Sequence, residues 1–182
     1  ALADRKSVVE GKSVAAGVAL GGRRINKTKN ELIKLALHDS LTRLPNRLLF
    51  ATRLEQRIQE CQHSQRSFSL LFLDLDGFKI INDAHGHHTG DLLLAEVAAR
   101  ITGLLGASDT ASRFGGDEFV LALAPGDLSQ TTAFAERLLA ALAQPYEWEH
   151  NSLHITASIG IAVYPQDGTS LHELTLNADA AM

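Results

Sequence analysis

The sequence predicts an α/β fold, an α+β sandwich with a ferredoxin-like or polymerase-palm-like β-α-β-β-α-β core and a central, mostly antiparallel sheet flanked by helices. Apolar runs of strand length alternate with segments of helical period along the chain. A Gly-Gly pair separates two strand-like runs, which is a strong signal for a tight hairpin. The chain has 182 residues, 45% of them hydrophobic, enough for one domain and a modest remainder.

The N-terminal part of the chain differs in composition from the rest. Residues 1–25 are rich in Gly, Ala, Val and basic residues without a steady period, so we expect a leader that is non-native or disordered. Residues 26–46 predict a linker helix, from the apolar residues between Leu32 and Leu37, and then a leading loop punctuated by Pro45. The main domain is expected to span residues 47–182.

Further helices are predicted where apolar residues recur at helical spacing. In chain order they cover Arg47–Gln65, Asp91–Leu105, Ser129–Leu142 and a last segment that begins at Ser170. Ser129 is the expected N-cap of the third of these helices, because a serine hydroxyl satisfies free backbone N–H groups.

Strands complete the predicted core. Ser67–Leu73 is a continuous apolar run, as expected for a strand buried on both faces. Strands at Ala111–Phe114 and Glu118–Ala124 flank the Gly-Gly turn. A strand over Leu153–Val163 carries a glycine interruption at Gly160.

Composition excludes several classes of protein. A single cysteine, Cys61, excludes a disulfide framework and suits a reducing compartment. The net charge of -4 argues against nucleic acid as a partner, although not against a nucleotide accompanied by cations. No apolar run approaches the ~18 residues of a membrane span, so we expect no membrane contact from this segment. His85, His87 and His88 lack cysteine partners at ligand spacing, which favours ordinary loop histidines over a zinc site.

Two acidic clusters stand at predicted strand ends. Asp74 and Asp76 follow the most apolar strand, and Asp117 and Glu118 follow the Gly-Gly pair. Taken singly, each acid could be a solvated turn residue. Strands that end side by side, however, would bring Asp74 close to Asp117. Two like charges at that distance require a cation, and oxygen ligands favour Mg²⁺.

The residues after the first cluster are of kinds that contact phosphates and bases. Gly77 lets backbone N–H groups approach phosphate oxygens, and Phe78 and Lys79 follow it. The ammonium group of Lys79 could counter the phosphate charge. Asn82 and Asp91 carry side chains that can pair with the donors and acceptors of a guanine edge.

Several motifs together resemble the GGDEF family of diguanylate cyclases. The signature RFGGDEF lies at Arg113–Phe119, preceded by LDLDGFKIINDAHGHHTGD and followed by TASIGIAVYPQDG. The leading loop DSLTRLPNR and the closing NADAAM fit the same family. The resemblance covers about four fifths of the chain, from Leu32 to the end, with the motifs in the family order. It implies that residues 47–182 are a GGDEF catalytic domain that lacks the end of its last helix.

The resemblance implies a metal site and three catalytic residues. Asp74 and Asp117 would hold Mg²⁺, for which Mn²⁺ can substitute, with the Leu75 carbonyl as a backbone ligand. Asp117, Glu118 and Lys79 would be catalytic, because Glu118 would assist the metal and proton chemistry and Lys79 would stabilise the transition state.

It also implies a substrate site for GTP. Phe78 and Lys79 would lie against the triphosphate, and Asn82 and Asp91 would bind guanine with His87 nearby. Two GTP molecules would be joined into cyclic di-GMP with release of two pyrophosphates. Each 3′-hydroxyl attacks the α-phosphate of the other GTP, so a homodimer would be needed. The implied location is the cytoplasm, alone or as the cytoplasmic part of a larger sensor protein.

The chain departs from the family pattern at two places. Many members carry an Arg-x-x-Asp product-inhibition site, but here Gly106 stands at the arginine position before Asp109. Glycine lacks the planar fork that clamps guanine or phosphate, so we expect a degenerate inhibitory site. The chain also stops at Met182, before the lysine that grips the terminal phosphates in the family, so we expect weakened GTP binding.

Two functions remain open on sequence grounds. The metal carboxylates, the guanine pair and Lys79 favour an active diguanylate cyclase. The alternative is a catalytically inactive, GTP-binding regulatory domain that controls an attached phosphodiesterase or other output module. The strings DSLTRLPNR and YPQDG are similar to the versions found where this domain precedes a cyclic di-GMP phosphodiesterase domain.

Overall fold

The computed structural model of the chain describes residues 31–148 and 151–182. The chain divides into two units, residues 1–37 and 38–182. The described part of the first is a helix over residues 31–37, as its apolar residues predict. The expected leader over residues 1–25 lies outside the described residues.

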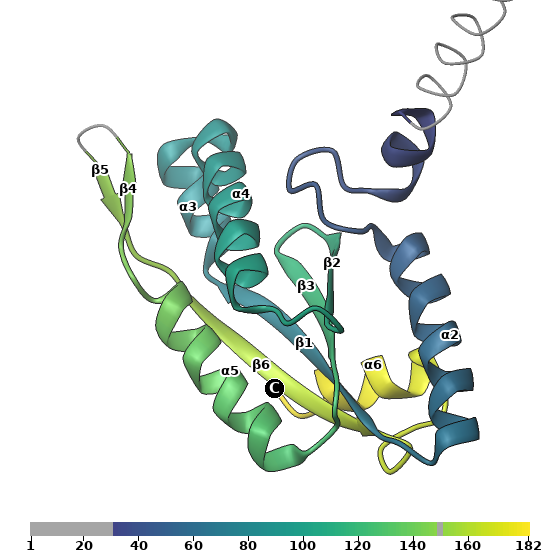
Figure 1. Cartoon of the computed structure of the whole chain (residues 1–182). Coiled ribbons are helices and arrows are strands. Elements are labelled where there is room, and N and C mark those ends of the chain that lie inside the picture. Colours follow the sequence, from purple (N-terminus) through teal and green to yellow (C-terminus); the bar gives the residue numbers. More distant parts are fainter. Residues whose placement is uncertain (1–30, 149–150) are drawn as a thin grey trace, which may run out of the picture. The chain divides into compact units, whose positions relative to one another are not determined.

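A four-stranded antiparallel sheet forms the centre of the second unit, with the strand order β2-β3-β1-β6 (Figure 1). Its strands are β1 Phe68–Asp76, β2 Thr110–Gly115, β3 Glu118–Leu123 and β6 Thr156–Tyr164. The two central strands, β1 and β3, are each followed by at least one helix before the chain returns to the sheet. This arrangement confirms the predicted β-α-β-β-α-β core.

Helices cover both faces of this sheet (Figure 1). They are α2 Arg47–Ser64, α3 Phe78–His85, α4 His87–Leu104, α5 Leu128–Leu142 and α6 Leu171–Asp179. Alternate side chains of β1 enter different cores, because successive residues of a strand point to opposite faces. Leu71 and Leu73 pack with α4 and α5, whereas Leu70 and Phe72 pack with α2 and α6.

The region between β1 and β2 is more helical than the sequence predicts. The predicted helix from Asp91 begins earlier, at His87, and a separate helix, α3, precedes it. Gly77 and Gly86, with φ of 74° and 84°, turn the chain before each helix. The expectation of loop histidines is therefore wrong, since His85 ends α3 and His87 begins α4.

Two further boundaries differ from the sequence prediction. The N-cap of α5 is Asp127 rather than Ser129, because the Asp127 carboxylate accepts hydrogen bonds from the backbone N–H groups of the next turn. The predicted strand over Leu153–Val163 is two strands, because β5, Asn151–Leu153, pairs with β4, Tyr146–Trp148, in a separate ribbon. Nothing in the periodicity of so short a ribbon distinguishes it from a loop.

The last helix begins where the sequence predicts. The Ser170 side chain accepts a hydrogen bond from the backbone N–H of Glu173 at 3.2 Å and caps α6. None of the helices in the described ranges is long and apolar enough to cross a membrane.

Candidate active site

The two acidic clusters meet at one end of the sheet. Asp74 of β1 lies opposite Glu118 of β3 in the antiparallel ladder, with Asp117 one residue earlier in the hairpin turn. Burial raises the pKa of Asp74, and the negative charges of Asp117, Glu118, Asp76 and Asp179 raise it further. The expected closeness of Asp74 and Asp117 is therefore present in the fold. A half-buried carboxylate among four others is suited to a cation.

We expect Asp74→Asn to raise the Tm of the metal-free protein by a few degrees at most near pH 8, because it removes a repelled charge that solvent partly screens. The sign follows from linkage: a carboxyl whose folded pKa is raised destabilises the fold fully above that folded pKa and not at all below the pKa of the unfolded chain. The gain should therefore shrink as the pH falls below the folded pKa of Asp74 and vanish below the ordinary pKa of an aspartate in the unfolded chain. Scanning calorimetry of both proteins, in the presence of a chelator and across this pH range, measures the difference in Tm. A difference in Tm that stays constant with pH would contradict the prediction.

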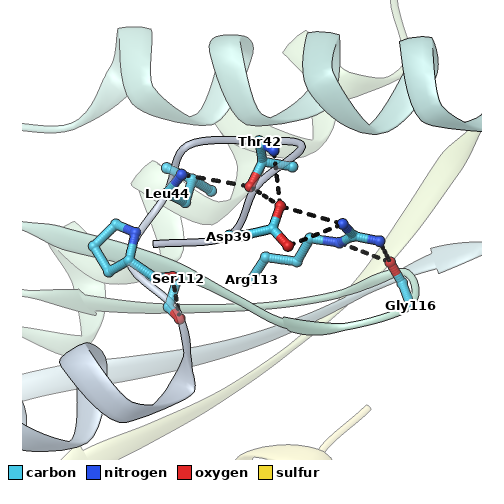
Figure 2. A network of polar contacts seen from close by, with 7 residues as sticks. Asp39, Thr42, Leu44, Ser112, Arg113 and Gly116 are labelled. Carbon is cyan, nitrogen blue, oxygen red and sulfur yellow. Dashed lines mark hydrogen bonds and ion pairs between the residues drawn. The ribbon is translucent and has the colours of Figure 1, made fainter. Parts of the chain in front are cut away.

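The side chain of Arg113 in β2 forms hydrogen bonds to the Gly-Gly turn (Figure 2). Gly116 has a φ of 52°, a conformation that glycine adopts without strain, and Asp117 follows it directly. The carbonyl of Gly116 accepts hydrogen bonds from Nε and Nη2 of Arg113, at 3.0 and 2.7 Å. The backbone that carries Asp117 is thus fixed by a side chain of the preceding strand.

Arg113 also ties the turn to the leading loop (Figure 2). Its Nη1 lies 3.2 and 3.3 Å from the two carboxylate oxygens of Asp39. Burial raises the pKa of Asp39, but hydrogen bonds from Thr42 and the charge and hydrogen bond of Arg113 outweigh it and leave this pKa below its usual value. The neighbouring Ser112 hydroxyl donates to the Pro45 carbonyl at 2.8 Å. The leading loop and the hairpin therefore form one polar network.

Helix α3 presents its first turn beside the acids. Gly77 occupies the N-cap without a side-chain hydrogen bond, so the first N–H groups of α3 lack a side-chain cap. Phe78 is buried in the core, whereas Lys79 is exposed. The residues expected to contact phosphate thus lie at the N-terminus of a helix.

The two expected guanine-binding residues lie where α3 packs against α4. Oδ1 of Asn82 is buried and has no hydrogen-bond partner within the described part of the chain. A Cβ atom at Gly90 would overlap this oxygen and lie 3.2 Å from Cζ of Phe78. Asp91 is the residue after Gly90 on α4, and His87 lies exposed one turn earlier. A buried amide oxygen without a partner points to a hydrogen-bond donor on a ligand.

We expect Gly90→Ala to weaken binding of a guanine nucleotide about tenfold, which corresponds to ~1.4 kcal/mol, because the new methyl group displaces the Asn82 side chain. Titration calorimetry with GTP measures this change. The control is Gly103→Ala on the same helix, where no atom lies within 4 Å of the new methyl group. Equal affinities of the two variants would show that Asn82 does not contact the base.

Gly106 and Asp109, the expected degenerate inhibitory pair, bond to each other. Oδ2 of Asp109 accepts from the backbone N–H of Gly106 at 2.8 Å, and Oδ1 accepts from that of Ala124 at 3.2 Å. One carboxylate oxygen thus bonds within the turn before β2, and the other bonds to the residue that follows β3. The nearby Arg57 guanidinium donates to the carbonyls of Ser108 and Ala122.

A cavity of about 460 Å³ opens beside the acids, on the face of the sheet that α2 and α6 cover. It is lined by Arg47, Phe72, Phe114, Glu118, Leu171, His172, Thr175, Leu176 and Asp179. Of the expected site residues only Glu118 lines it. The guanidinium of Arg47 lies 5.3 Å from the centre of the Phe114 ring, a cation–π distance.

No group of three or more His, Cys, Asp or Glu side chains in residues 31–148 and 151–182 is arranged to hold a metal ion. The expected Mg²⁺ set has only two carboxylates and a backbone carbonyl. Magnesium sites commonly take their remaining ligands from water and substrate phosphates.

Sequence reasoning assigned no role to four residues that shape this site. Asp39 and Arg113 support the hairpin turn, Gly90 makes room for Asn82, and Asp179 adds a charge near Asp74. An aspartate three residues before a threonine is a capping pattern that could have drawn attention to Asp39. The roles of Arg113 and Asp179 depend on contacts between distant parts of the chain, and that of Gly90 depends on how α3 packs against α4.

Comparison with known proteins identifies similar chains. The family described as "Diguanylate cyclase, GGDEF domain" matches residues 36–182. The bifunctional diguanylate cyclase/cyclic di-GMP phosphodiesterase MucR of Pseudomonas aeruginosa is 54% identical over 156 residues, which are 86% of this chain and 23% of MucR. The cyclic di-GMP phosphodiesterase NbdA of the same organism is 39% identical over 170 residues, covering 87% of this chain and 21% of NbdA.

Solved structures agree with these matches. The crystal structure of a sensory box/GGDEF family protein from Caulobacter crescentus superposes with a TM-score of 0.76 at 39% identity, covering 80% of this chain and 94% of that one. The present chain spans less than a quarter of the length of the two curated relatives, 23% and 21%.

Proposed function

Since this chain belongs to the GGDEF domain family of diguanylate cyclases, we propose that it joins two molecules of GTP into cyclic di-GMP and two pyrophosphates. The 3′-oxygen of each GTP forms a bond to the α-phosphorus of the other GTP. The bond from that phosphorus to the bridging oxygen breaks, and pyrophosphate leaves with its electron pair. The reaction uses GTP, and the proposed location is therefore the cytoplasm.

The meeting of Asp74, Asp117 and Glu118 at adjacent strand ends carries this proposal. The raised pKa of Asp74 reflects burial and like charges, and a cation among these acids would relieve both. Hard carboxylate and carbonyl oxygens match the preference of Mg²⁺, with Mn²⁺ as its substitute. The residues present therefore fit a divalent cation.

The proposed roles follow from where each side chain lies. Asp74, Asp117 and the carbonyl of Leu75 would hold the metal ion. When bound, Mg²⁺ would lower the pKa of the attacking hydroxyl and neutralise charge at the reacting phosphorus. Glu118, beside them, would assist removal of the hydroxyl proton. Lys79, exposed in the first turn of α3, would stabilise charge on the triphosphate.

The base would lie between α3 and α4. The unpartnered Oδ1 of Asn82 would accept a hydrogen bond from guanine, and the Asp91 carboxylate would accept from its N1–H and amino group. Phe78 would lie against the triphosphate from the core side, and His87 would lie near the base. Because one chain offers one such set of residues, each protomer of a homodimer would hold one GTP facing the other.

The test is a turnover assay of the chain fused to a dimerising coiled coil, with GTP and Mg²⁺ and chromatographic detection of cyclic di-GMP. Product formation that requires Mg²⁺ or Mn²⁺ supports the proposal. An intact fused dimer that yields no product at high concentration would refute it.

A second candidate is a catalytically inactive GTP-binding domain that regulates an attached phosphodiesterase. The observation in its favour is that NbdA is named for phosphodiesterase activity alone, whereas MucR is named for both activities. This candidate predicts GTP binding, measured by calorimetry, without any product in the assay above. The two outcomes are mutually exclusive, so the same pair of measurements decides between them.

Product inhibition at the degenerate site is expected to be absent. Asp109 uses both oxygens on backbone N–H groups, and Gly106 offers no side chain to bind a guanine or phosphate. We therefore expect Asp109→Asn to leave turnover and its response to added cyclic di-GMP within about twofold of those of the unaltered protein. Sub-micromolar binding of cyclic di-GMP to the catalytically inactive Asp117→Ala variant, lost on Asp109→Asn, would contradict this.

A further inference from the structure

Both carboxylate oxygens of Asp76, the last residue of β1, accept hydrogen bonds from side chains of β6. The Thr156 hydroxyl donates to Oδ2 at 2.7 Å, and the Ser158 hydroxyl donates to Oδ1 at 2.9 Å. In the ladder Thr156 lies opposite Asp76, whereas Ser158 lies opposite Asp74. Ser158 thus bonds diagonally to Asp76 rather than to the acid that faces it.

Asp74 and Asp76 point to the same face of the sheet, because they are two residues apart on one strand. Their surroundings nevertheless differ. The carboxylate of Asp74 accepts no hydrogen bond in the described structure, whereas that of Asp76 accepts one from each of two hydroxyl groups. Of the two carboxylates, that of Asp76 therefore receives a hydroxyl group of β6 on each oxygen, whereas that of Asp74 receives none in the described structure.

The chain leaves the sheet immediately after Asp76. Gly77 turns it with a φ of 74°, and the carbonyl of Gly77 accepts from the N–H groups of Ile80 at 2.9 Å and Ile81 at 3.4 Å. Gly77 therefore joins Asp76, which the two hydroxyls hold, to the first turn of α3, which carries Lys79. On the other side of Asp76 is Leu75, whose carbonyl is a proposed metal ligand.

We propose that Asp76 is a positioning residue that acts through Thr156 and Ser158, fixing the turn at Gly77 and the start of α3 against the triphosphate. This inference rests on the proposed function, because it assigns a purpose to a turn that would contact GTP. Asp76 is in this view not a metal ligand but an exposed carboxylate that two hydroxyl groups of β6 hold in place. Charge-assisted hydrogen bonds from two hydroxyls on the neighbouring strand are short and directional, which suits them to fixing backbone position.

The first test compares Asp76→Ala, the double variant Thr156→Val with Ser158→Ala, and the triple variant. We expect the first two each to raise KM for GTP about tenfold with kcat changed less than about threefold, because a misplaced turn weakens substrate binding. The triple variant should be no worse than Asp76→Ala, since all three substitutions remove the same interaction. Glu136→Gln, which removes an exposed charge on α5, is the control and should leave both constants unchanged.

A metal ligand would behave differently. Asp76→Ala would then lower kcat strongly and raise the Mg²⁺ concentration needed, while the hydroxyl variants stayed near the parent protein. That result would overturn the inference, as would additive effects in the triple variant. If the parent protein binds GTP without turnover, the proposed function fails. The inference is then tested by the dissociation constant for GTP, measured by calorimetry in place of KM.

The second test needs neither turnover nor nucleotide. Hydrogen exchange of the Ile80 and Ile81 amides, which bond to Gly77, should accelerate about tenfold in Asp76→Ala and in the hydroxyl double variant, but not in Glu136→Gln. Unchanged exchange would overturn the inference even in an active enzyme. Faster exchange with an unchanged KM or dissociation constant would overturn its link to the triphosphate. If the parent protein neither turns over nor binds GTP, both the proposed function and this link fail.

Discussion

Asp117→Ala is expected to lower formation of cyclic di-GMP at least about a thousandfold, equivalent to ~4 kcal/mol of transition-state stabilisation. Asp117 is one of only two carboxylates in the proposed metal set, and it follows directly on the turn that Arg113 holds through the Gly116 carbonyl. Removal of its carboxylate leaves Asp74 and a backbone carbonyl to hold a divalent cation. Binding of the metal in the geometry required for the reaction should then fail.

The same substitution should leave the fold intact, because Asp117 is a half-buried residue of the hairpin turn that belongs to neither hydrophobic core. The measurements are product formation by chromatography and Tm by circular dichroism, with Glu136→Ala on α5 as a charge-matched control. Residual activity within about tenfold of the parent protein would show that Asp117 does not hold the metal ion.

Gly160→Ala is expected to cause the largest loss of stability, about 3 kcal/mol, with a fall in Tm of about 6–12 °C. Gly160 lies in β6 opposite Phe72, and a Cβ atom there would overlap the backbone carbonyl oxygen of Ala178 in α6. A backbone carbonyl cannot rotate away as a flexible side chain can. The helix as a whole would have to move off the sheet.

Thermal unfolding of Gly160→Ala against Gly103→Ala separates this contact from the general effect of replacing a glycine. Gly103 lies exposed in α4 with open space around it, and alanine there should be neutral or slightly stabilising. An unchanged Tm for Gly160→Ala would mean that α6 adjusts without cost. Because Asp179 follows Ala178, we also expect a displaced α6 to weaken the repulsion felt by Asp74.

The sequence was most informative about local features. The alternation of apolar runs predicted the sheet, and the Gly-Gly pair predicted the β2–β3 hairpin, since both signals act over a few residues. It was least informative about short helices and caps. Helix α3 has only eight residues, and the sequence predicts no helix there, because glycines such as Gly77 and Gly86 at its ends are typical of loops.

In the candidate site, too, the sequence indicates some residues and not others. Asp74 and Asp117 were singled out because acids at the ends of apolar strands are unusual, and their closeness followed from antiparallel pairing. The contacts that hold these residues in place could not be predicted from the sequence. Arg113 reaches Asp39 across 74 residues, and the overlap of a Cβ at Gly90 with Asn82 depends on how α3 packs against α4.

By itself the sequence determined the strands, the hairpin and the presence of acids at strand ends, because periodicity and turn chemistry are properties of neighbouring residues. Only the tertiary structure shows that, within the Asp74–Leu75–Asp76 run, the carboxylate of Asp76 is held by hydroxyl groups of β6 and that of Asp74 is not. That difference depends on Thr156 and Ser158, which lie 80 and 82 residues from Asp76 along the chain. They reach it because β1 and β6 pair in one register, and that register is set by packing of the whole sheet.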